Sequence, residues 1–147
     1  MNSHYRLLLF LIIYMLESGF SCNNKSHNRE SIESAMKYYD HLILKTDADS
    51  IAFLYTPNGE LGNMAVGRDS IRNFLNRFKN FKVLYQSTTT DSITIKDDTA
   101  ILKGIYHQKV IVPSGDTVSV KGEYNAKWIW LKDGGWHIRR METHPIP

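Results

Sequence analysis

The chain has 147 residues, a formal net charge of +3 at neutral pH, 42% hydrophobic residues and 12% aromatic residues. This length suits one domain with a single core, which the aromatic side chains help to build. The small charge excess argues against a nucleic-acid-binding protein, and the single cysteine excludes an internal disulfide or a cysteine-based metal site.

The N-terminal segment has the pattern of a secretory signal. His4 and Arg6 precede an apolar run from Leu7 to Leu16, and a short stretch rich in small residues follows it. The run is shorter than the roughly 20 apolar residues that cross a bilayer. Cys22 lies where a bacterial lipoprotein carries its lipid, and the segment resembles such a signal, although Gly19 replaces the usual leucine.

These features divide the chain into three parts. We expect a signal peptide over residues 1–21, a polar tether over residues 22–28 that begins at lipidated Cys22, and a domain over residues 29–147. The domain would then be held by its lipid at a membrane of the bacterial cell envelope, facing the periplasm or the exterior. An ordinary signal peptide and an uncleaved anchor remain alternatives.

Three helices are predicted at the start of the domain. Residues 30–45 carry apolar side chains at spacings of three and four, with Asn28 as the N-cap. A second, shorter helix begins at Asp47 or Asp49 and stops at Pro57-Asn58-Gly59. After one or two short strands within residues 60–64, Asp69 caps a third helix over residues 70–78. The basic residues of this region (Arg68, Arg72, Arg77, Lys79 and Lys82) are typical of a solvated helix face.

The rest of the chain is predicted to be strands. Segments rich in Val, Ile, Thr and Tyr alternate with short turns that contain Asp, Pro or Gly. Such short turns predict an antiparallel meander. The four strands are expected at residues 82–95, 100–112, 117–131 and 136–143. Helices followed by a sheet indicate an α+β fold in which the helices cover one face of the sheet.

Two stretches carry a resemblance to a known family. The third helix begins Val66-Gly67-Arg68-Asp69-Ser70-Ile71-Arg72-Asn73-Phe74, and the last hairpin runs from Trp128 to Ile138 through Asp133-Gly134-Gly135. With the order of elements, they resemble the nuclear transport factor 2-like superfamily, in its SnoaL-like or DUF4440-type branch. The resemblance implies a cone in which a curved antiparallel sheet of about four long strands wraps around three N-terminal helices. It also implies a pocket at the open end, and many members are dimers, so we expect homodimer contacts on the convex face.

Strand alternation predicts which side chains face that pocket. Tyr124 and Trp128 share one face of the third long strand, and Arg140, Glu142 and His144 share a face of the last strand with two apolar residues. Polar groups among aromatic ones are the usual composition of a small-molecule site. Arg140 would hold an anionic group, while Glu142 and His144 are the candidates for acid/base catalysis. Alternatively, Arg140 and Glu142 form a surface ion pair.

Tyrosines of the helices are further candidates. Tyr38 and Tyr55 could each donate a hydrogen bond to a ligand in an apolar pocket, as could Tyr39 beside Tyr38. Steroid-isomerase-like relatives carry a catalytic aspartate between the second and third helices, and the equivalent position here is near Asn63, whose amide is not a base. Epoxide-hydrolase-like relatives use an Asp/Arg/Asp set that has no convincing carrier in this chain, since Glu60 is the only nearby carboxylate.

No motif indicates a metal or a cofactor. The chain has no metal-binding histidine spacing, no Gly-rich phosphate loop and no nucleophile motif, so we expect neither a metal nor a cofactor. Three hypotheses follow. The first is a non-catalytic domain that binds a small apolar or partly anionic ligand, the second an isomerase-, hydrolase- or dehydratase-type enzyme using Glu142 and His144. The third is a protein-interaction subunit whose pocket is filled.

Overall fold

The computed structural model describes residues 27–132 and 134–146. The predicted signal segment, Cys22 and most of the tether therefore lie outside the described residues. Within the described part of the chain, no helix combines the length and apolarity that a membrane crossing requires.

Three α-helices and one short 3-10 helix precede the four long strands in the described chain, with two short strands between the second and third α-helices. Asn28 caps the first helix as predicted, because its side chain accepts a hydrogen bond from the Ser31 amide, while the Ser31 hydroxyl accepts one from the Asn28 amide. Asp47 caps the second helix, where its side chain accepts a hydrogen bond from the Ser50 amide. The third helix starts two residues earlier than predicted, with Gly67 as its N-cap and Asp69 inside its first turn. Their bounds are α2 (Arg29–Lys45), α3 (Ala48–Leu54), α4 (Arg68–Leu75) and η1 (Asn76–Phe78).

The predicted meander is confirmed and belongs to a larger sheet. Six strands form one sheet in the order β2-β1-β6-β5-β4-β3, and their bounds are β1 (Tyr55–Leu61), β2 (Ala65–Val66), β3 (Lys82–Lys96), β4 (Thr99–Ile111), β5 (Thr117–Leu131) and β6 (Gly135–Pro145). The sheet is not wholly antiparallel, because β1 runs parallel to β6. Pro57 lies inside β1 rather than ending a helix, at a point where the β1–β6 register is irregular.

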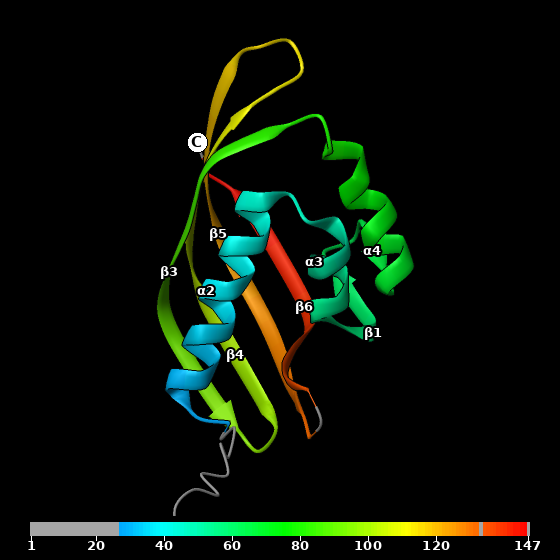
Figure 1. The fold of residues 1–147 in the computed structure, drawn as a ribbon. Coiled ribbons are helices and arrows are strands. Elements are labelled where there is room, and N and C mark those ends of the chain that lie inside the picture. The colour runs from blue at the N-terminus through cyan, green and yellow to red at the C-terminus, as the bar shows by residue number, and fades with distance from the viewer. Residues whose placement is uncertain (1–26, 133, 147) are drawn as a thin grey trace, which may run out of the picture.

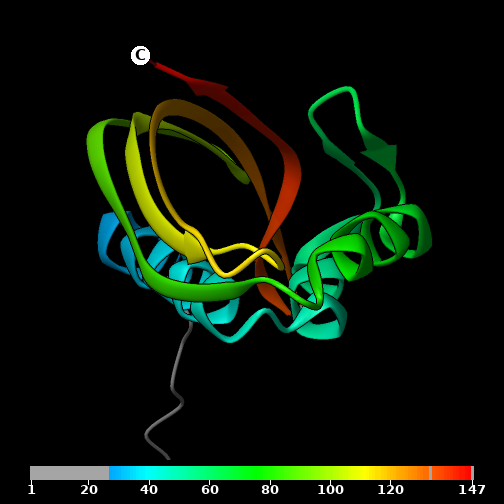
Figure 2. The ribbon, with the colours of Figure 1, turned by 90° about the horizontal axis from the view of Figure 1, so that it is seen from above.

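The sheet curls around the helices, as the cone prediction requires. Figure 1 shows α2 lying across the faces of β3, β4 and β5, while α3 and α4 cover the side of β1 and β6. Seen from above, the four long strands bend into an arc with the helices along its open side (Figure 2). The curvature leaves room between sheet and helices that side chains only partly fill.

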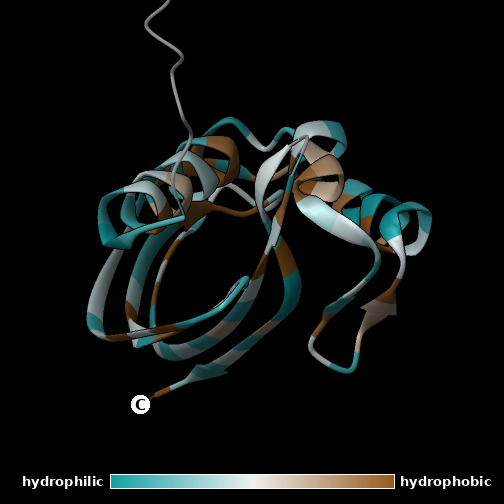
Figure 3. Cartoon of the chain, turned by 90° about the horizontal axis from the view of Figure 1, so that it is seen from below, coloured by the Kyte–Doolittle hydropathy of each residue, from teal (hydrophilic) through white to brown (hydrophobic). Residues whose placement is uncertain are grey.

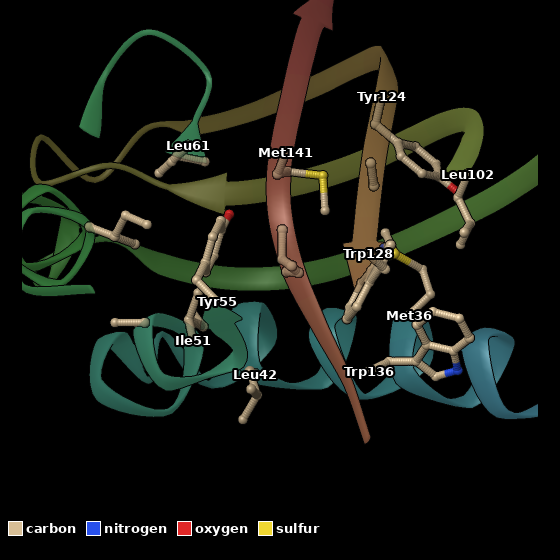
Figure 4. Packing of buried hydrophobic residues seen from close by; sticks show 14 of the residues in the cluster. Met36, Leu42, Ile51, Tyr55, Leu61, Leu102, Tyr124, Trp128, Trp136 and Met141 are labelled. Atoms are coloured by element: carbon tan, nitrogen blue, oxygen red, sulfur yellow. The ribbon is translucent and has the colours of Figure 1, made fainter. Parts of the chain in front are cut away.

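The core lies between the concave face of the sheet and the helices. Hydrophobic and hydrophilic residues alternate along the curved strands (Figure 3), as expected for strands with one buried face. Figure 4 shows the indoles of Trp128 and Trp136 beside Met36 of α2, at the end of the core nearest that helix. Trp128 is fully buried and Trp136 is 5% exposed, so both indoles face inward as predicted.

A β-bulge in β6 changes which of its residues face the core. Trp128 pairs with Ile138, but the preceding Lys127 pairs with Arg140, so Arg139 is an extra residue on β6. Beyond this point the odd-numbered residues face inward, and Met141, which is 1% exposed, takes the place that regular alternation assigns to Arg140. The bulge therefore sends the even-numbered residues of the C-terminal half of β6 to the convex face.

Candidate functional site

A cavity of about 440 Å³ lies between the helices and the concave sheet. Its walls come from every long strand and from α2, α3, α4 and η1, so the whole fold rather than one loop lines it. Most of the lining is apolar, with Val, Ile, Leu, Met and Phe side chains. The polar members among the described lining residues are Tyr39, Thr46, Gln86, Thr88, Tyr106, Gln108, Tyr124 and Thr143.

None of the described residues that line the cavity is charged at neutral pH. The lining contains no Asp, Glu, His, Lys or Arg. The described part of the chain also holds no group of three or more His, Cys, Asp or Glu side chains placed to bind a metal ion. Because burying an unpaired charge costs several kcal/mol or more, such a cavity favours a neutral occupant.

The tyrosines of the cavity stay protonated at physiological pH. Burial raises the pKa of Tyr39 to about 12, with a partial offset from Tyr55 and a further rise from Asp40. Burial likewise raises the pKa of Tyr106 and of Tyr124. Each phenol can therefore donate a hydrogen bond to a neutral ligand. The Tyr124 hydroxyl already shares one with Thr90 Oγ1 at 2.6 Å.

Tyr55 lies beside Tyr39 at the deep end of the cavity. It is fully buried, and its hydroxyl points away from the helices, toward the side of Leu61 and Met141 (Figure 4). Burial and the adjacent Tyr39 raise the Tyr55 pKa well above its ordinary value. The two phenols are close enough for this effect, yet the Tyr55 hydroxyl makes no hydrogen bond of good geometry to any described residue.

A carboxylate outside the lining positions two of the polar side chains. Asp40 of α2 accepts hydrogen bonds from Gln86 Nε2 at 2.9 Å and from the amide and hydroxyl of Thr88 at 2.9 and 2.7 Å. Gln86 and Thr88 line the cavity from β3. Asp40 thus connects the helix layer to the strand at the edge of the sheet and holds this wall in place.

Only some of the predicted ligand-binding residues line the cavity. Tyr124 lines the cavity, as predicted. Trp128 faces inward but belongs to the solid core, and Tyr55 lies behind the wall, so neither is among the lining residues. Tyr38 is 51% exposed and points away, because the next residue, Tyr39, occupies the inward side of α2.

The inward placement of Arg140, Glu142 and His144 is wrong. The bulge at Arg139 moves all three to the convex face. Arg140 donates hydrogen bonds to Glu142 Oε1 at 2.9 Å from Nε and 2.7 Å from Nη2, and it also pairs with Glu60. This is the alternative surface ion pair. His144 is exposed, opposite Glu123 on the neighbouring strand.

A signal for the bulge is visible in the sequence. The apolar residues of the last strand are Trp136, Ile138 and Met141, so their spacing changes from two to three. Two consecutive arginines fill the gap, and Arg139 and Arg140 both reach Glu60 on β1. A strand with one face buried keeps its period of two unless a residue is inserted, so this change in spacing predicts a bulge.

Asn63 and Glu60, which were considered as counterparts of the catalytic carboxylates of enzyme-like relatives, do not line the cavity. Asn63 is exposed in the turn between β1 and β2 and does not line the cavity. Glu60 points to the convex side, where it pairs with the two arginines.

Two residues of β4 that line the cavity, Tyr106 and Gln108, were not predicted from the sequence. Both are even-numbered, like the buried Leu102 and Val110 of the same strand, and this alternation could have indicated that they face inward.

The fold and its interior cavity define a cone-shaped α+β domain. The model of the SnoaL-like domain family matches residues 24–142, and the chain therefore belongs to this family. The search of curated proteins finds no match.

Solved structures share the fold at low sequence identity. A ketosteroid isomerase-like protein from Erwinia carotovora atroseptica is 17% identical with a TM-score of 0.73, covering 83% of this chain and 98% of that one. A nuclear transport factor 2-like superfamily protein from Salmonella enterica is 16% identical with a TM-score of 0.67, covering 80% of this chain and 90% of that one. These similarities establish the nuclear transport factor 2-like architecture and leave the chemistry to the residues of this chain.

Proposed function

We propose that this SnoaL-like domain binds a small, neutral and mainly apolar molecule in its interior cavity. The observation that carries the proposal is a cavity of about 440 Å³ whose described lining has no charged side chain. Ligand cavities for small molecules commonly measure about 300–1,000 Å³ and combine apolar walls with a few polar groups. Tyr39, Gln108 and Tyr124 supply such groups here.

The position of Arg140 favours a neutral ligand over a partly anionic one. Arg140 was the cation expected to hold an acid group, and it is engaged by Glu60 and Glu142 on the opposite face. The acid/base enzyme is less well supported for the same reason, because Glu142 and His144 do not reach the cavity. A filled pocket, which the protein-interaction hypothesis needs, does not fit the open volume.

The flexible side chains of the lining favour tolerance toward ligand shape. Met36, Met64 and Met141 lie in three different walls. Methionine has three rotatable bonds and a polarizable sulfur, and it adapts to irregular partners better than branched side chains do. We therefore expect the cavity to accept a class of apolar molecules rather than one rigid shape.

A matched pair of fluorescent probes tests the proposal. N-phenyl-1-naphthylamine is neutral, whereas 8-anilinonaphthalene-1-sulfonate is the same ring system with a sulfonate. We expect the neutral probe to bind with increased fluorescence and the sulfonate at least about tenfold more weakly, since no lining cation compensates its charge. Tighter binding of the sulfonate would contradict the proposal.

Two adjacent residues of β5 provide the matched variants. Val120 lines the cavity, while Ser119 is exposed on the other face of the strand. Val120→Trp fills part of the space and should weaken binding of the neutral probe by about tenfold or more, whereas Ser119→Trp should leave it unchanged. Circular dichroism checks that both variants fold. Equal binding by the two variants would place the probe outside the cavity.

We also propose that the domain works in the bacterial cell envelope, held by a lipid on Cys22. The support is the N-terminal pattern of the sequence, which lies outside the described residues. Cys22→Ser should move the protein from the membrane fraction to the soluble fraction of bacteria that express it. Unchanged membrane association would refute the lipid anchor and favour the uncleaved segment.

A further inference from the structure

The cavity opens through an apolar rim. Three of its lining side chains are also substantially exposed: Met64 at 53%, Phe78 at 40% and Val118 at 42%. They come from the β1–β2 turn, from η1 and from the start of β5. Phe78 packs edge-on against Phe74 and Phe81, with ring centroids 5.5 and 5.3 Å away, yet part of its ring remains in solvent. We call Met64, Phe78 and Val118 the mouth residues.

The chain at this opening carries positive charge without a compensating acid. Residues 76–82 read Asn-Arg-Phe-Lys-Asn-Phe-Lys, and they contain three exposed cations and no carboxylate. We call Arg77, Lys79 and Lys82 the mouth cations. Among the described residues none of them makes an ion pair, although Arg77 stacks on Phe74 at 5.6 Å. By contrast, Arg72, Arg139 and Arg140 each pair with an Asp or Glu.

We infer that the mouth docks on the surface of an anionic lipid bilayer, from which an apolar ligand enters the cavity. Aromatic and aliphatic side chains next to Lys and Arg are the composition of surfaces that lie in the membrane interface. Each cation is attracted by anionic headgroups, and the mouth residues can leave water for the lipid. The ligand's route rests on the proposed function, because apolar molecules are concentrated in membranes; the docking itself does not.

The apolar rim distinguishes a membrane from other anionic partners. A nucleic acid would neutralise the mouth cations but leave the mouth residues in water, since its backbone is polar and charged. A bilayer satisfies both at once. The only acid at the neighbouring β4–β5 turn is Asp116, which accepts a hydrogen bond from Ser114. The charge at the opening therefore stays positive overall.

This surface is separate from any attachment at the N-terminus. Figure 1 shows α2 entering the domain at the end opposite the connection from α4 to β3. A helix of 17 residues is about 25 Å long, and the few residues between Cys22 and Asn28 reach roughly 20 Å when extended. A lipid on Cys22 would not by itself bring the mouth to a membrane. The mouth must therefore dock through its own residues.

Vesicle binding of the domain tests the inference. The chain from His27 onward contains the entire core cluster, from Ile32 to Met141, and lacks the N-terminal apolar run. We expect it to sediment with vesicles of phosphatidylglycerol and phosphatidylcholine, more weakly with phosphatidylcholine alone, and less at high salt. Equal binding to both vesicle types would overturn the inference.

Matched charge variants locate the surface. The first replaces the three mouth cations by glutamine; the second does the same to three exposed lysines of the convex face, Lys103, Lys121 and Lys127, so both lose the same charge. At about fivefold per cation, the mouth variant should bind anionic vesicles on the order of 100-fold more weakly. The convex variant should stay within about threefold of the wild type. Equal losses would show an effect of net charge and refute the mouth as the docking site.

Two further variants separate docking from ligand binding. Phe78→Ser should weaken binding to anionic vesicles by about tenfold while its salt dependence stays the same, because it removes apolar contact and no charge. Val120→Trp should bind vesicles like the wild type even though it binds the neutral probe about tenfold or more weakly. For the unsubstituted domain, vesicle binding without binding of the neutral probe would refute only the proposed function, and probe binding without vesicle binding would refute only the docking surface.

Discussion

Asp40 offers the sharpest test of how the cavity wall is held. Its carboxylate accepts three hydrogen bonds from β3, one from Gln86 and two from Thr88, at 2.7–2.9 Å. These bonds connect residues 46 and 48 positions apart in the sequence and join α2 to a strand at the edge of the sheet. Few other polar contacts join these two layers.

Asp40→Ala removes all three bonds and leaves the Thr88 amide without its partner. A hydrogen bond to a charged group contributes about 1.5–3 kcal/mol, but Asp40 is only half-buried, so water can replace part of what is lost. We expect a loss of about 3 kcal/mol in the free energy of unfolding. For a domain of this size that lowers the melting temperature by roughly 10 °C.

Urea and thermal unfolding followed by circular dichroism measure this loss. Asp40→Asn keeps one oxygen for the Thr88 amide and should lose about half as much stability. Asp91→Ala removes an exposed carboxylate of the same strand that makes no side-chain hydrogen bond or ion pair with the described residues, and it should change stability by less than about 0.5 kcal/mol. A loss below about 1 kcal/mol for Asp40→Ala would refute the proposed role of this carboxylate.

Three other predictions concern packing, buried hydroxyls and pH. Gly104→Ala should destabilise the domain by about 3 kcal/mol in urea unfolding, because the added methyl group would overlap the carbonyl oxygen of Thr89 on β3. Tyr55→Phe should leave the free energy of unfolding equal or higher, because the Tyr55 hydroxyl has no hydrogen-bond partner of good geometry. Tyr124→Phe should lower it by about 1 kcal/mol, because it removes the hydrogen bond with Thr90. A larger loss for Tyr55→Phe than for Tyr124→Phe would contradict this reasoning. Burial and the nearby Arg68 lower the pKa of His137 below 6.5, so protonation favours the unfolded chain. The stability of the domain should therefore fall as the pH drops through 6.5. His137→Gln should lose less stability over the same pH range, as measured by thermal unfolding at several pH values.

Local features were predicted well because they depend on neighbours in the sequence. The Asn28 cap needs only Ser31 three residues later, and the four long strands need only alternation and short turns. The small strands were harder to place, since β1 runs through Pro57 and exists only because β6 lies beside it. Homodimer contacts on the convex face stay a prediction.

The candidate site was predicted only in part. Tyr124 faces the cavity because regular alternation holds along that part of β5, where each residue has one partner on β4. The same rule failed in β6, where one inserted residue moved Arg140, Glu142 and His144 to the other face. A single bulge thereby removed every charged group from the predicted pocket.

The amino-acid sequence by itself determined the α+β class, the order of the helices and long strands, and the burial of Trp128 and Trp136, because these follow from periodicity and turn residues acting over a few positions. Only the tertiary structure decided the chemistry of the cavity. Whether a side chain of β6 points inward depends on its register against β1 and β5, which is set by packing among distant segments. The neutral lining of the cavity is therefore a property of the assembled sheet.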